Sequence, residues 1–481
     1  MNNHDSWAIK NLKGLTQDSR AVKKGFLFAA LPGSKSDGRK FIEDAIRNGA
    51  CAILAPMGTA LPEGVQGVDL IVDDNPRHRL AVMAAEFYGR QPDFIAAVTG
   101  TNGKTSTVHF VRDLWKQRGV KAASIGTLGV RGPELMRSGS LTTPDPVSLH
   151  ADLADLAAAG VGHLVMEASS IGLHQHRLDG VKVNVAAYTN LSWDHLDYHA
   201  DMDNYLESKM RLFAAVLVPG GTAVLNADTP EFEAIKKMVE ARGCRVLSYG
   251  YKGQDLKILS ATAEPNGQKL KLEIFGSVYE IMFPVVGFFQ VMNALCAMGI
   301  VISEKEGLAA AVVDGLSLLQ GPPGRLQLVP GHPNGAAVYV DYAHTPDALK
   351  NVLEALRPHT SGKLVCLFGC GGDRDRSKRP AMGAIAAEMA DSVFVTDDNP
   401  RSEDAVLIRK DILKECLGAQ EIADRREAIR LAVQGLKQGD VLVIAGKGHE
   451  QGQIFADHTD PFDDVTEAEK SIKEMKNNEC R

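Results

Sequence analysis

The sequence lacks several features that define whole classes of protein. Nowhere do about 18 apolar residues run together, which argues against a transmembrane helix, and the opening stretch MNNHDSWAIK has no apolar signal core. None of the seven cysteines forms a CxxC pair, so we expect reduced thiols and a cytoplasmic protein. The net charge of −7 argues against a general partner of nucleic acids or anionic membranes.

The chain is rich enough in apolar residues for more than one core. It has 481 residues, of which 44% are hydrophobic, and we expect an α/β protein of three domains. Residues 1–91 are predicted to form a small N-terminal α/β domain. Residues 92–325 are predicted to form a central α/β domain, with an antiparallel patch around the turn Pro265-Asn266-Gly267. Residues 326–481 alternate compact strands with helices, which predicts a Rossmann-like, doubly wound C-terminal domain.

The stretch VTGTNGKTS at 98–106 joins a predicted strand to a helix through a glycine-rich turn. Such a turn points backbone N–H groups at phosphates. Lys104 would reach the β- and γ-phosphates, and the Thr105 hydroxyl would coordinate Mg²⁺. The alternative is an ordinary turn before a helix, since Val98 replaces the first glycine of the full motif. We predict a P-loop-type ATPase domain whose ATP-binding residues include Gly100, Thr101, Asn102, Gly103, Lys104, Thr105 and Ser106.

Polar side chains follow the next apolar run, LVMEASSIGLHQHRL at 164–178. Glu167 could complete the Mg²⁺ shell begun by Thr105, or it could be a solvated acidic residue at a strand end. Ser169, Gln175 and Arg177 are suited to an anionic or sugar-like substrate, although each could also be a surface residue. This segment is therefore a second candidate part of the site.

A third candidate is the His/carboxylate loop of Asp194, His195 and Asp197, with the helix behind it. Lys209 lies within the apolar stripe of that helix. It either extends its ammonium group to water or is desolvated, with a depressed pKa. In the second case it could take up CO₂ as a carbamate and offer oxygen ligands to a second Mg²⁺ beside His195.

Polar clusters also follow the strands of the C-terminal domain, where ligands of such sheets bind. The loop GCGGDRDRSKRP at 369–380 has the composition of an anion site, or of a solvated charged loop. In FVTDDNPRSED, Arg401 stands just after an Asn-Pro turn, and Glu450 in AGKGHEQ could receive a ligand ammonium group. With no pattern of a covalent nucleophile, these motifs predict phosphorylation of a substrate and its joining to a zwitterion.

The motifs above, in this order, resemble those of the Mur ligase family over essentially the whole chain. The resemblance includes four further stretches: GSKSDGRKFI, LTTPD, GPPGRLQ and YVDYAHTPDAL. The resemblance implies an ATP-dependent carboxylate–amine ligase of peptidoglycan synthesis. ATP would phosphorylate the D-glutamyl γ-carboxylate of UDP-N-acetylmuramoyl-L-alanyl-D-glutamate, and an amino acid would attack the acyl phosphate. It also implies two Mg²⁺ sites, small-molecule substrates and a monomeric cytoplasmic enzyme.

The resemblance assigns roles to particular residues. The residues implied in catalysis are Lys104, Glu167, His195 and Lys209, and the metal ligands are Thr105, Glu167, His195 and carbamylated Lys209. Further ATP contacts are implied for Asn293, Arg325 and His344, with Gln290 standing where the family commonly has asparagine. The UDP-muramoyl-dipeptide would be held by Gln17, Ser19, Ser34, Lys35, Ser36, Thr142, Thr143, Ser169, Gln175 and Arg177.

The Asp-Asn-Pro-Arg loop is, in this family, typical of members that add meso-2,6-diaminopimelate. This amino acid is lysine with a second carboxylate, which Arg401 can bind through two parallel hydrogen bonds. Lysine would leave a buried guanidinium unpaired, at a cost of roughly 3–5 kcal/mol. The implied pocket is Arg374, Asp398, Asn399, Pro400, Arg401, Gly446 and Glu450.

Four alternatives stay open at this point. Two share the same chemistry: an L-lysine-adding Mur ligase and an enzyme like folylpolyglutamate synthetase. The others are a P-loop ATPase that forms no bond and a catalytically inactive binding protein.

Overall fold

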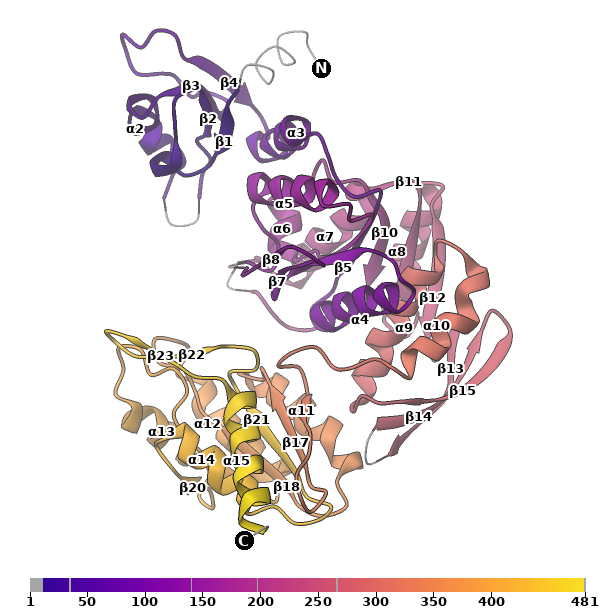
Figure 1. Ribbon diagram of the computed structural model, residues 1–481. Coiled ribbons are helices and arrows are strands. Elements are labelled where there is room, and N and C mark those ends of the chain that lie inside the picture. Colours follow the sequence, from indigo (N-terminus) through magenta and orange to yellow (C-terminus); the bar gives the residue numbers. More distant parts are fainter. Residues whose placement is uncertain (1–11, 34–35, 140, 197, 265–266, 480–481) are drawn as a thin grey trace. The chain divides into compact units, whose positions relative to one another are not determined.

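The structure is a computed structural model that describes residues 12–33, 36–139, 141–196, 198–264 and 267–479 (Figure 1). The chain divides into two compact units, Met1–Lys257 with Leu295–Val312, and Ile258–Ala294 with Val313–Arg481. Within the described ranges, no helix has the length and apolar character needed to cross a membrane. The six cysteines described there are all free thiols.

The first unit begins with a four-stranded parallel sheet. Its strands, in spatial order, are β1 (Gly14–Thr16), β2 (Phe26–Ala29), β3 (Ala50–Pro56) and β4 (Asp69–Asp73). Alternate side chains of a strand point to opposite faces, so Leu27 packs in the core cluster of α3 (Pro76–Tyr88), whereas Phe28 packs in that of α2 (Ile42–Arg47). Two 3₁₀ turns, η1 (Ser19–Ala21) and η2 (Gly38–Phe41), connect these elements.

A larger, mostly parallel sheet follows in the same unit. Its parallel strands, in spatial order, are β12 (Arg245–Gly250), β11 (Leu217–Asn226), β10 (Val183–Tyr188), β5 (Phe94–Thr99), β9 (His163–Glu167) and β6 (Ala122–Gly126). The short antiparallel strands β7 (Gly129–Arg131) and β8 (Met136–Arg137) extend it. Because β5 lies between β10 and β9, the loops that follow these three strands emerge side by side.

Helices connect the strands of this sheet. They are α4 (Lys104–Gln117), α5 (Pro146–Ala158), α6 (Ser170–His174), α7 (Met202–Arg211) with the π-helical turn η3 (Leu212–Val216), and α8 (Phe232–Ala241). Three further elements are η4 (Glu306–Leu308), α9 (Phe288–Ile302) and α10 (Ala309–Leu316), of which α9 and α10 have residues in both units. A core of residues such as Leu149, Leu164 and Phe213 fills the space between helices and sheet.

The predicted antiparallel patch is present. Strand β13 (Leu256–Glu264) pairs with β12 and is followed in the sheet by β14 (Gly267–Ile274) and β15 (Ser277–Phe283). β14 and β15 pair antiparallel, from Gln268↔Phe283 to Ile274↔Ser277. Pro265 and Asn266 of the predicted turn lie outside the described residues.

The rest of the second unit contains a doubly wound sheet, as the strand–helix alternation predicts. Its strands, in spatial order, are β16 (Gln327–Val329), β17 (Ala337–Asp341), β21 (Val441–Ala445), β18 (Leu364–Phe368), β19 (Ser392–Val395) and β20 (Gln420–Glu421). All pairs are parallel except β16–β17. A small ribbon, β22 (Gly452–Ile454) with β23 (Thr459–Pro461), follows β21.

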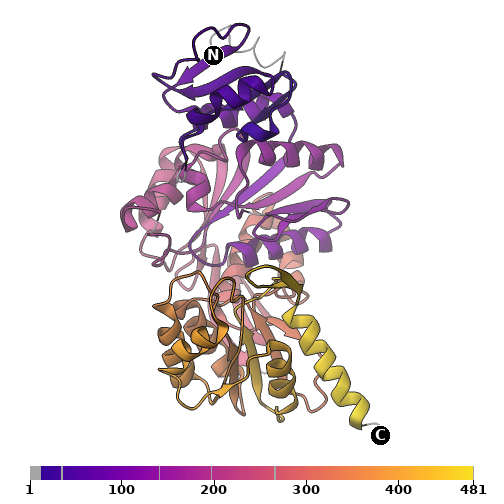
Figure 2. The same cartoon turned by 90° about the vertical axis from the view of Figure 1, so that its left-hand side faces the viewer.

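Helices cover both faces of this sheet. One core holds residues of α11 (Pro346–Leu356), α12 (Lys378–Met389) and α13 (Ala405–Leu413); the short turn η5 (Arg357–His359) continues α11. The other core holds residues of α14 (Arg425–Gln434) and α15 (Asp464–Glu479), and Figure 2 shows α15 as the long C-terminal helix. The loops after β18, β19 and β21 therefore share the carboxyl edge of one sheet.

Candidate active site

The loop between β5 and α4 has a backbone that requires glycine at two points. Gly100 has φ 144°, and a Cβ there would lie 1.9 Å from Thr189 Oγ1. Gly103 has φ 85° and precedes the first residue of α4. Only glycine adopts such angles without strain. The turn therefore leads into the N-terminus of a 14-residue helix, the place where backbone N–H groups favour phosphate.

Lys104 lies against this loop. Its Nζ donates to the carbonyl oxygens of Gly100 and Thr101, at 2.8 and 2.7 Å. Asn190, for which the sequence predicts no role, holds the loop from the end of β10: its Oδ1 accepts from the backbone N–H of Asn102 at 2.9 Å. The signal in the sequence that could have indicated Asn190 is its position at the start of NLSWDHLDYH, residues 190–199, which contains the His/carboxylate loop.

Glu167 ends β9 and is 2% exposed, so it is not a solvated strand-end residue. Both its carboxylate oxygens lie 3.1 Å from the Thr105 hydroxyl. The Thr127 N–H donates to Oε1 at 2.8 Å, and a Cβ at Gly126 would lie 2.2 Å from the same oxygen. A carboxylate and a hydroxyl fixed in this way form a donor set that fits Mg²⁺, a hard cation that prefers oxygen ligands.

Lys209 is 1% exposed, so its ammonium group does not extend to water. Its Nζ lies 4.1 Å from the centre of the Tyr205 ring. Burial and the charge of Lys104 hold the pKa of Lys209 well below its usual range, against an opposing effect of Asp194. A lowered pKa increases the neutral fraction of such a lysine.

His195 stands near the same tyrosine. Its ring centre is 6.2 Å from that of Tyr205, and its backbone has φ 54°, a left-handed conformation. The Tyr205 hydroxyl lies 3.1 Å from Thr101 Oγ1, so this tyrosine connects the phosphate loop to His195 and Lys209. Asp197, the third member of the predicted His/carboxylate loop, lies outside the described residues.

Five of the residues implied for the muramoyl-dipeptide form a hydrogen-bonded series beside Glu167: Thr142, Thr143, Ser169, Gln175 and Arg177. The Thr143 hydroxyl donates to the Glu167 carbonyl at 2.9 Å, and Arg177 Nη1 donates to the Thr143 carbonyl at 2.6 Å. Arg177 also donates to Gln175 Oε1 at 2.7 Å. The Thr142 hydroxyl lies 3.1 Å from that of Thr127. These polar groups are therefore connected to Glu167, through Thr143 on one side and through Thr127 on the other.

The other described residues of that set, Gln17, Ser19 and Ser36, lie in the segments that connect the strands of the four-stranded sheet. Gln17 follows β1, and its Nε2 lies 3.4 Å from Oδ1 of Asp145, the N-cap of α5. Ser19 begins η1, and Ser36 is exposed in a turn closed by its carbonyl and Gly33 N–H. Ser34 and Lys35 lie outside the described residues.

A cluster that the sequence did not suggest joins α3 to the segment after α6. The Asp179 carboxylate accepts hydrogen bonds from His78 Nδ1 at 2.6 Å, His176 Nδ1 at 2.7 Å and Arg211 Nη2 at 3.0 Å. Two histidines and a carboxylate are potential metal ligands. Here the guanidinium of Arg211 already supplies a positive charge to the carboxylate, so we interpret the cluster as a hydrogen-bonded clamp.

In the second unit, Asn399 connects the two charged groups expected to bind an amino acid. Its Nδ2 donates to Glu450 Oε2 at 2.9 Å. Arg401 is half-buried, has φ 52°, and donates through Nη1 to the carbonyls of Gly372 at 2.9 Å and Asn399 at 3.5 Å. A guanidinium and a carboxylate thus lie at one edge of the sheet, held by one asparagine.

The remaining residues of this predicted pocket have varied surroundings. Asp398 is 6% exposed, and its Oδ1 lies 3.2 Å from the ammonium group of Lys447. Gly446 has φ 115°, and a Cβ there would approach Asp398 Oδ2 to 3.0 Å. The Pro400 carbonyl oxygen packs against Gly372: a Cβ on Gly372 would lie 1.9 Å from it. Arg374 is exposed, and its Nη1 donates to the Asp373 carbonyl at 3.4 Å.

Some of the basic side chains in the loop at 369–380 are paired with carboxylates. Arg379 is 1% exposed and donates to Glu403 at 2.9 Å and Asp411 at 3.2 Å. Arg376 also pairs with Glu403, at 2.9 Å. These acidic partners neutralise guanidinium groups that, by composition, were expected to bind an anion.

Three residues implied for the nucleotide lie in the second unit. The Arg325 guanidinium stacks 4.7 Å from the centre of the Tyr342 ring, and His344 lies 4.6 Å from the same ring, centre to centre. Asn293 on α9 is buried and donates to Gln290 Oε1 at 3.0 Å. The fully buried Gln290 has no hydrogen-bond partner for Nε2 in the described part of the chain.

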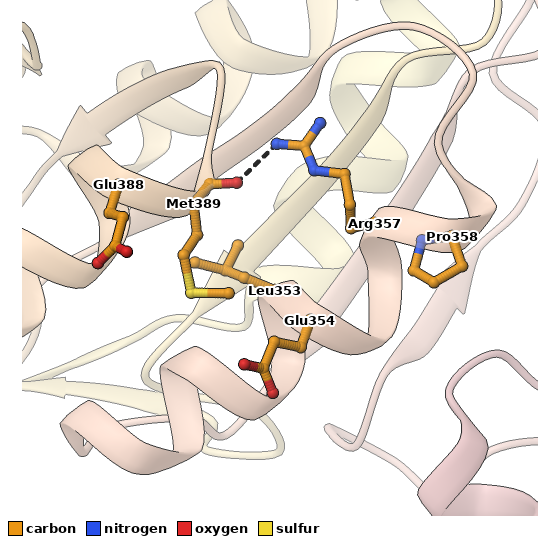
Figure 3. A pocket seen from close by; sticks show the side chains of 6 residues that line it. All are labelled: Leu353, Glu354, Arg357, Pro358, Glu388 and Met389. Atoms are coloured by element: carbon orange, nitrogen blue, oxygen red, sulfur yellow. Dashed lines mark hydrogen bonds between the residues drawn. The ribbon is translucent and has the colours of Figure 1, made fainter.

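A hollow of about 370 Å³ in the second unit is separate from these residues (Figure 3). It is lined by Leu353, Glu354, Arg357, Pro358, Glu388 and Met389. Arg357 Nη2 donates to the Met389 carbonyl at 2.6 Å across it. None of the predicted site residues contributes to its lining.

A phosphate loop, a buried carboxylate beside its threonine and a separate strand-end pocket define an ATP-using ligase. Comparison with known families agrees, since three family descriptions match successive parts of the chain. Residues 11–88 match "Mur ligase family, catalytic domain", residues 98–301 "Mur ligase middle domain" and residues 324–448 "Mur ligase, glutamate ligase domain". The chain belongs to the Mur ligase family of ATP-dependent amide ligases and has its three-domain α/β architecture.

Curated relatives are similar over nearly their full length. The chain is 50% identical over 461 residues to the UDP-N-acetylmuramoyl-L-alanyl-D-glutamate–2,6-diaminopimelate ligase of Brucella melitensis, covering 96% of this chain and 94% of the relative. It is also 50% identical, over 468 residues, to the ligase of the same name from Caulobacter vibrioides, covering 96% of each chain.

Solved structures extend the comparison. A structure of a UDP-N-acetylmuramoyl-L-alanyl-D-glutamate–2,6-diaminopimelate ligase matches with a TM-score of 0.73 at 35% identity, covering 97% of this chain and 95% of that one. The MurF ligase from Thermotoga maritima in complex with ADP matches with a TM-score of 0.62 at 20% identity, covering 99% and 100%. The second match shows the fold alone.

Proposed function

We propose that this protein is an ATP-dependent ligase of peptidoglycan synthesis. It would add meso-2,6-diaminopimelate to the D-glutamyl γ-carboxylate of UDP-N-acetylmuramoyl-L-alanyl-D-glutamate, forming an amide, ADP and phosphate. The observation that carries this proposal is the pairing of Arg401 and Glu450 through Asn399 at one sheet edge. The relatives that share about half of the sequence carry the name of this activity.

The reaction needs an activated carboxylate, because the oxygen of a free carboxylate would have to leave as oxide or hydroxide, a poor leaving group, whereas phosphate is a good one. The substrate γ-carboxylate attacks the γ-phosphorus of ATP, the bond to the ADP oxygen breaks, and an acyl phosphate forms. The amine of the amino acid then attacks the acyl carbon, and the bond to phosphate breaks as the amine loses a proton. Lys104 and the N–H groups at the start of α4 would stabilise the phosphate charge during transfer.

The predicted metal positions fit this scheme. Mg²⁺ held by the Thr105 hydroxyl and the Glu167 carboxylate would neutralise phosphate charge. Lys209 is suited to a carbamate because only a neutral amine reacts with CO₂, and burial favours the neutral form. His195, whose ring centre lies 6.2 Å from that of Tyr205, would share the second position.

The amino-acid pocket gives the proposed selectivity. Arg401 would pair with the distal carboxylate of diaminopimelate, and Glu450 with Gly446 would receive the distal ammonium group. L-Lysine has no distal carboxylate and would leave Arg401 without its partner. We also propose that the protein acts in the cytoplasm as a monomer on these small molecules, with no nucleic-acid or membrane partner.

The test is phosphate release with ATP, Mg²⁺ and the UDP-muramoyl-dipeptide, comparing meso-diaminopimelate with L-lysine. We expect turnover to depend on diaminopimelate. A preference for L-lysine would keep the ligase and refute the role of Arg401. Phosphate release that needs no amino acid would instead indicate an ATPase without ligase activity.

A further inference from the structure

The second unit contains a fully buried lysine that has no part in the reaction as described so far. Lys447 follows β21 and is 0% exposed. Its Nζ donates to Asn399 Oδ1 at 2.7 Å and to Asp398 Oδ1 at 3.2 Å, and lies 3.6 Å from Glu450 Oε2. A buried ammonium group is tolerated only with such partners. The charge of Lys447 is therefore compensated by residues of the proposed amino-acid pocket, and Lys447 in turn holds these residues in place.

The first consequence concerns the side-chain amide of Asn399. An asparagine amide can turn by 180° and exchange its oxygen and nitrogen. Here Oδ1 faces two groups that can only donate, the Lys447 ammonium and the Ile454 N–H at 3.0 Å. Nδ2 must then face Glu450, to which it donates at 2.9 Å. Lys447 and the Ile454 N–H together thus orient Asn399 so that its Nδ2 supports the Glu450 carboxylate.

The second consequence concerns charge. Arg425 and Asp464, both 0% exposed, pair through two hydrogen bonds of 2.7 Å, and each interacts with the charge of Asp398. Lys447 compensates Asp398 in the same buried group. These two cations and two carboxylates balance one another. The third carboxylate near Lys447 is that of Glu450, at 3.6 Å from Nζ; its side chain is 34% exposed, so it can also meet a ligand.

The same asparagine also contacts the arginine of the pocket. The Asn399 carbonyl lies 3.5 Å from Arg401 Nη1, and the N–H of Arg401 donates to the Ile454 carbonyl at 3.1 Å. The contact of Lys447 with Asn399 therefore affects both Glu450 and Arg401, the two charged groups that would bind the amino acid.

We propose that Lys447 is a positioning residue for amino-acid selection: it orients Asn399 and neutralises Asp398, so that Glu450 alone receives the distal ammonium group of the substrate. This inference rests on the proposed function. Without Lys447, Asn399 Oδ1 keeps only the Ile454 N–H as a donor, so the amide is held less firmly, and Asp398 becomes a second, competing carboxylate beside Glu450. The substrate would then bind less tightly and in more than one position.

The test is a set of steady-state measurements on Lys447→Met, Asn399→Ala and the double variant. We expect Lys447→Met to raise the KM for diaminopimelate at least tenfold, with kcat and the KM for ATP within twofold of wild type. Because part of the effect of Lys447 passes through Asn399, its substitution should raise the KM for diaminopimelate less in the Asn399→Ala background than in the wild type. Lys350→Met, at an exposed lysine of the same unit, is the matched control and should change nothing.

Three results would overturn the role of Lys447: an unchanged KM, equal losses for ATP and diaminopimelate, or fully additive effects. If Lys447→Met does not fold, Asn399→Asp decides, because it keeps a partner for Lys447 and removes the donor to Glu450. A tenfold higher KM would then support the proposal, and an unchanged KM would refute it. A wild-type enzyme that ignores diaminopimelate would instead refute the proposed function itself.

Discussion

Replacing Arg401 by alanine tests the source of the preference for diaminopimelate. Arg401 is half-buried, and its Nη1 is held by the Gly372 carbonyl at 2.9 Å. Two charge-assisted hydrogen bonds to a carboxylate, discounted for this partial exposure, are worth about 2–3 kcal/mol. At 1.4 kcal/mol per factor of ten, the loss in kcat/KM for diaminopimelate is about 30- to 150-fold. This is less than a fully buried guanidinium would give, because water can reach the side chain.

The substitution isolates the side chain well. Arg401 has φ 52°, a left-handed conformation that costs alanine and arginine about the same, so alanine keeps the backbone cost of arginine. Glycine would remove that cost and confuse the result. Arg430→Ala, at an arginine on α14 that pairs with Glu427, is a matched control that should leave both substrates unaffected.

The assay is phosphate release as a function of each substrate in turn. We expect kcat/KM for diaminopimelate to fall as stated, while the KM for ATP and the slow rate with L-lysine stay within about threefold. Equal losses for ATP and diaminopimelate would show that Arg401 supports the fold of the pocket and does not bind the distal carboxylate.

Three further outcomes follow from the first unit. Lys209→Met should lower kcat at least a hundredfold and abolish the carbamate signal that ¹³C-labelled bicarbonate gives by NMR; wild-type activity without that signal would exclude a carbamate. Burial lowers the pKa of His150 to about 4, so the unfolded chain binds an extra proton between that pH and about 6.5. Unfolding free energy should therefore fall by about 2 kcal/mol from pH 7 to pH 5, and urea titrations of His150→Gln should lack this part of the loss. Gly126→Ala should raise the KM for ATP at least tenfold, because its Cβ would lie 2.2 Å from Glu167 Oε1; Gly162→Ala, with open space around its Cβ, should be neutral, and equal behaviour of the two variants would contradict the assignment.

Local features of the sequence were enough to predict the elements that bear the site. The strand, the glycine-rich turn and the helix at 94–117 can be predicted because apolar runs, glycine and helix starts act over a few residues. The alternating strands and helices after residue 326 predicted the doubly wound sheet for the same reason. The meeting of Thr105 with Glu167 also followed, since carboxyl ends of adjacent parallel strands share one edge.

The burial of Lys209 could not be predicted. Its place in an apolar stripe was visible, but whether the ammonium reaches water depends on Tyr205 and on the residues packed around it. Likewise, composition marked 369–380 as basic, whereas Glu403 and Asp411, which neutralise Arg379, come from other segments.

The sequence by itself therefore determined the family, the order of elements and the motifs that bear chemistry, because each depends on residues close together in the chain. Only the tertiary structure decided which side chains form hydrogen bonds or ion pairs with one another. Lys447 and Asn399 are 48 residues apart and follow different strands, yet their 2.7 Å contact determines which way the amide faces. Such contacts arise from the packing of the whole sheet, and desolvation acts on them only once that packing exists.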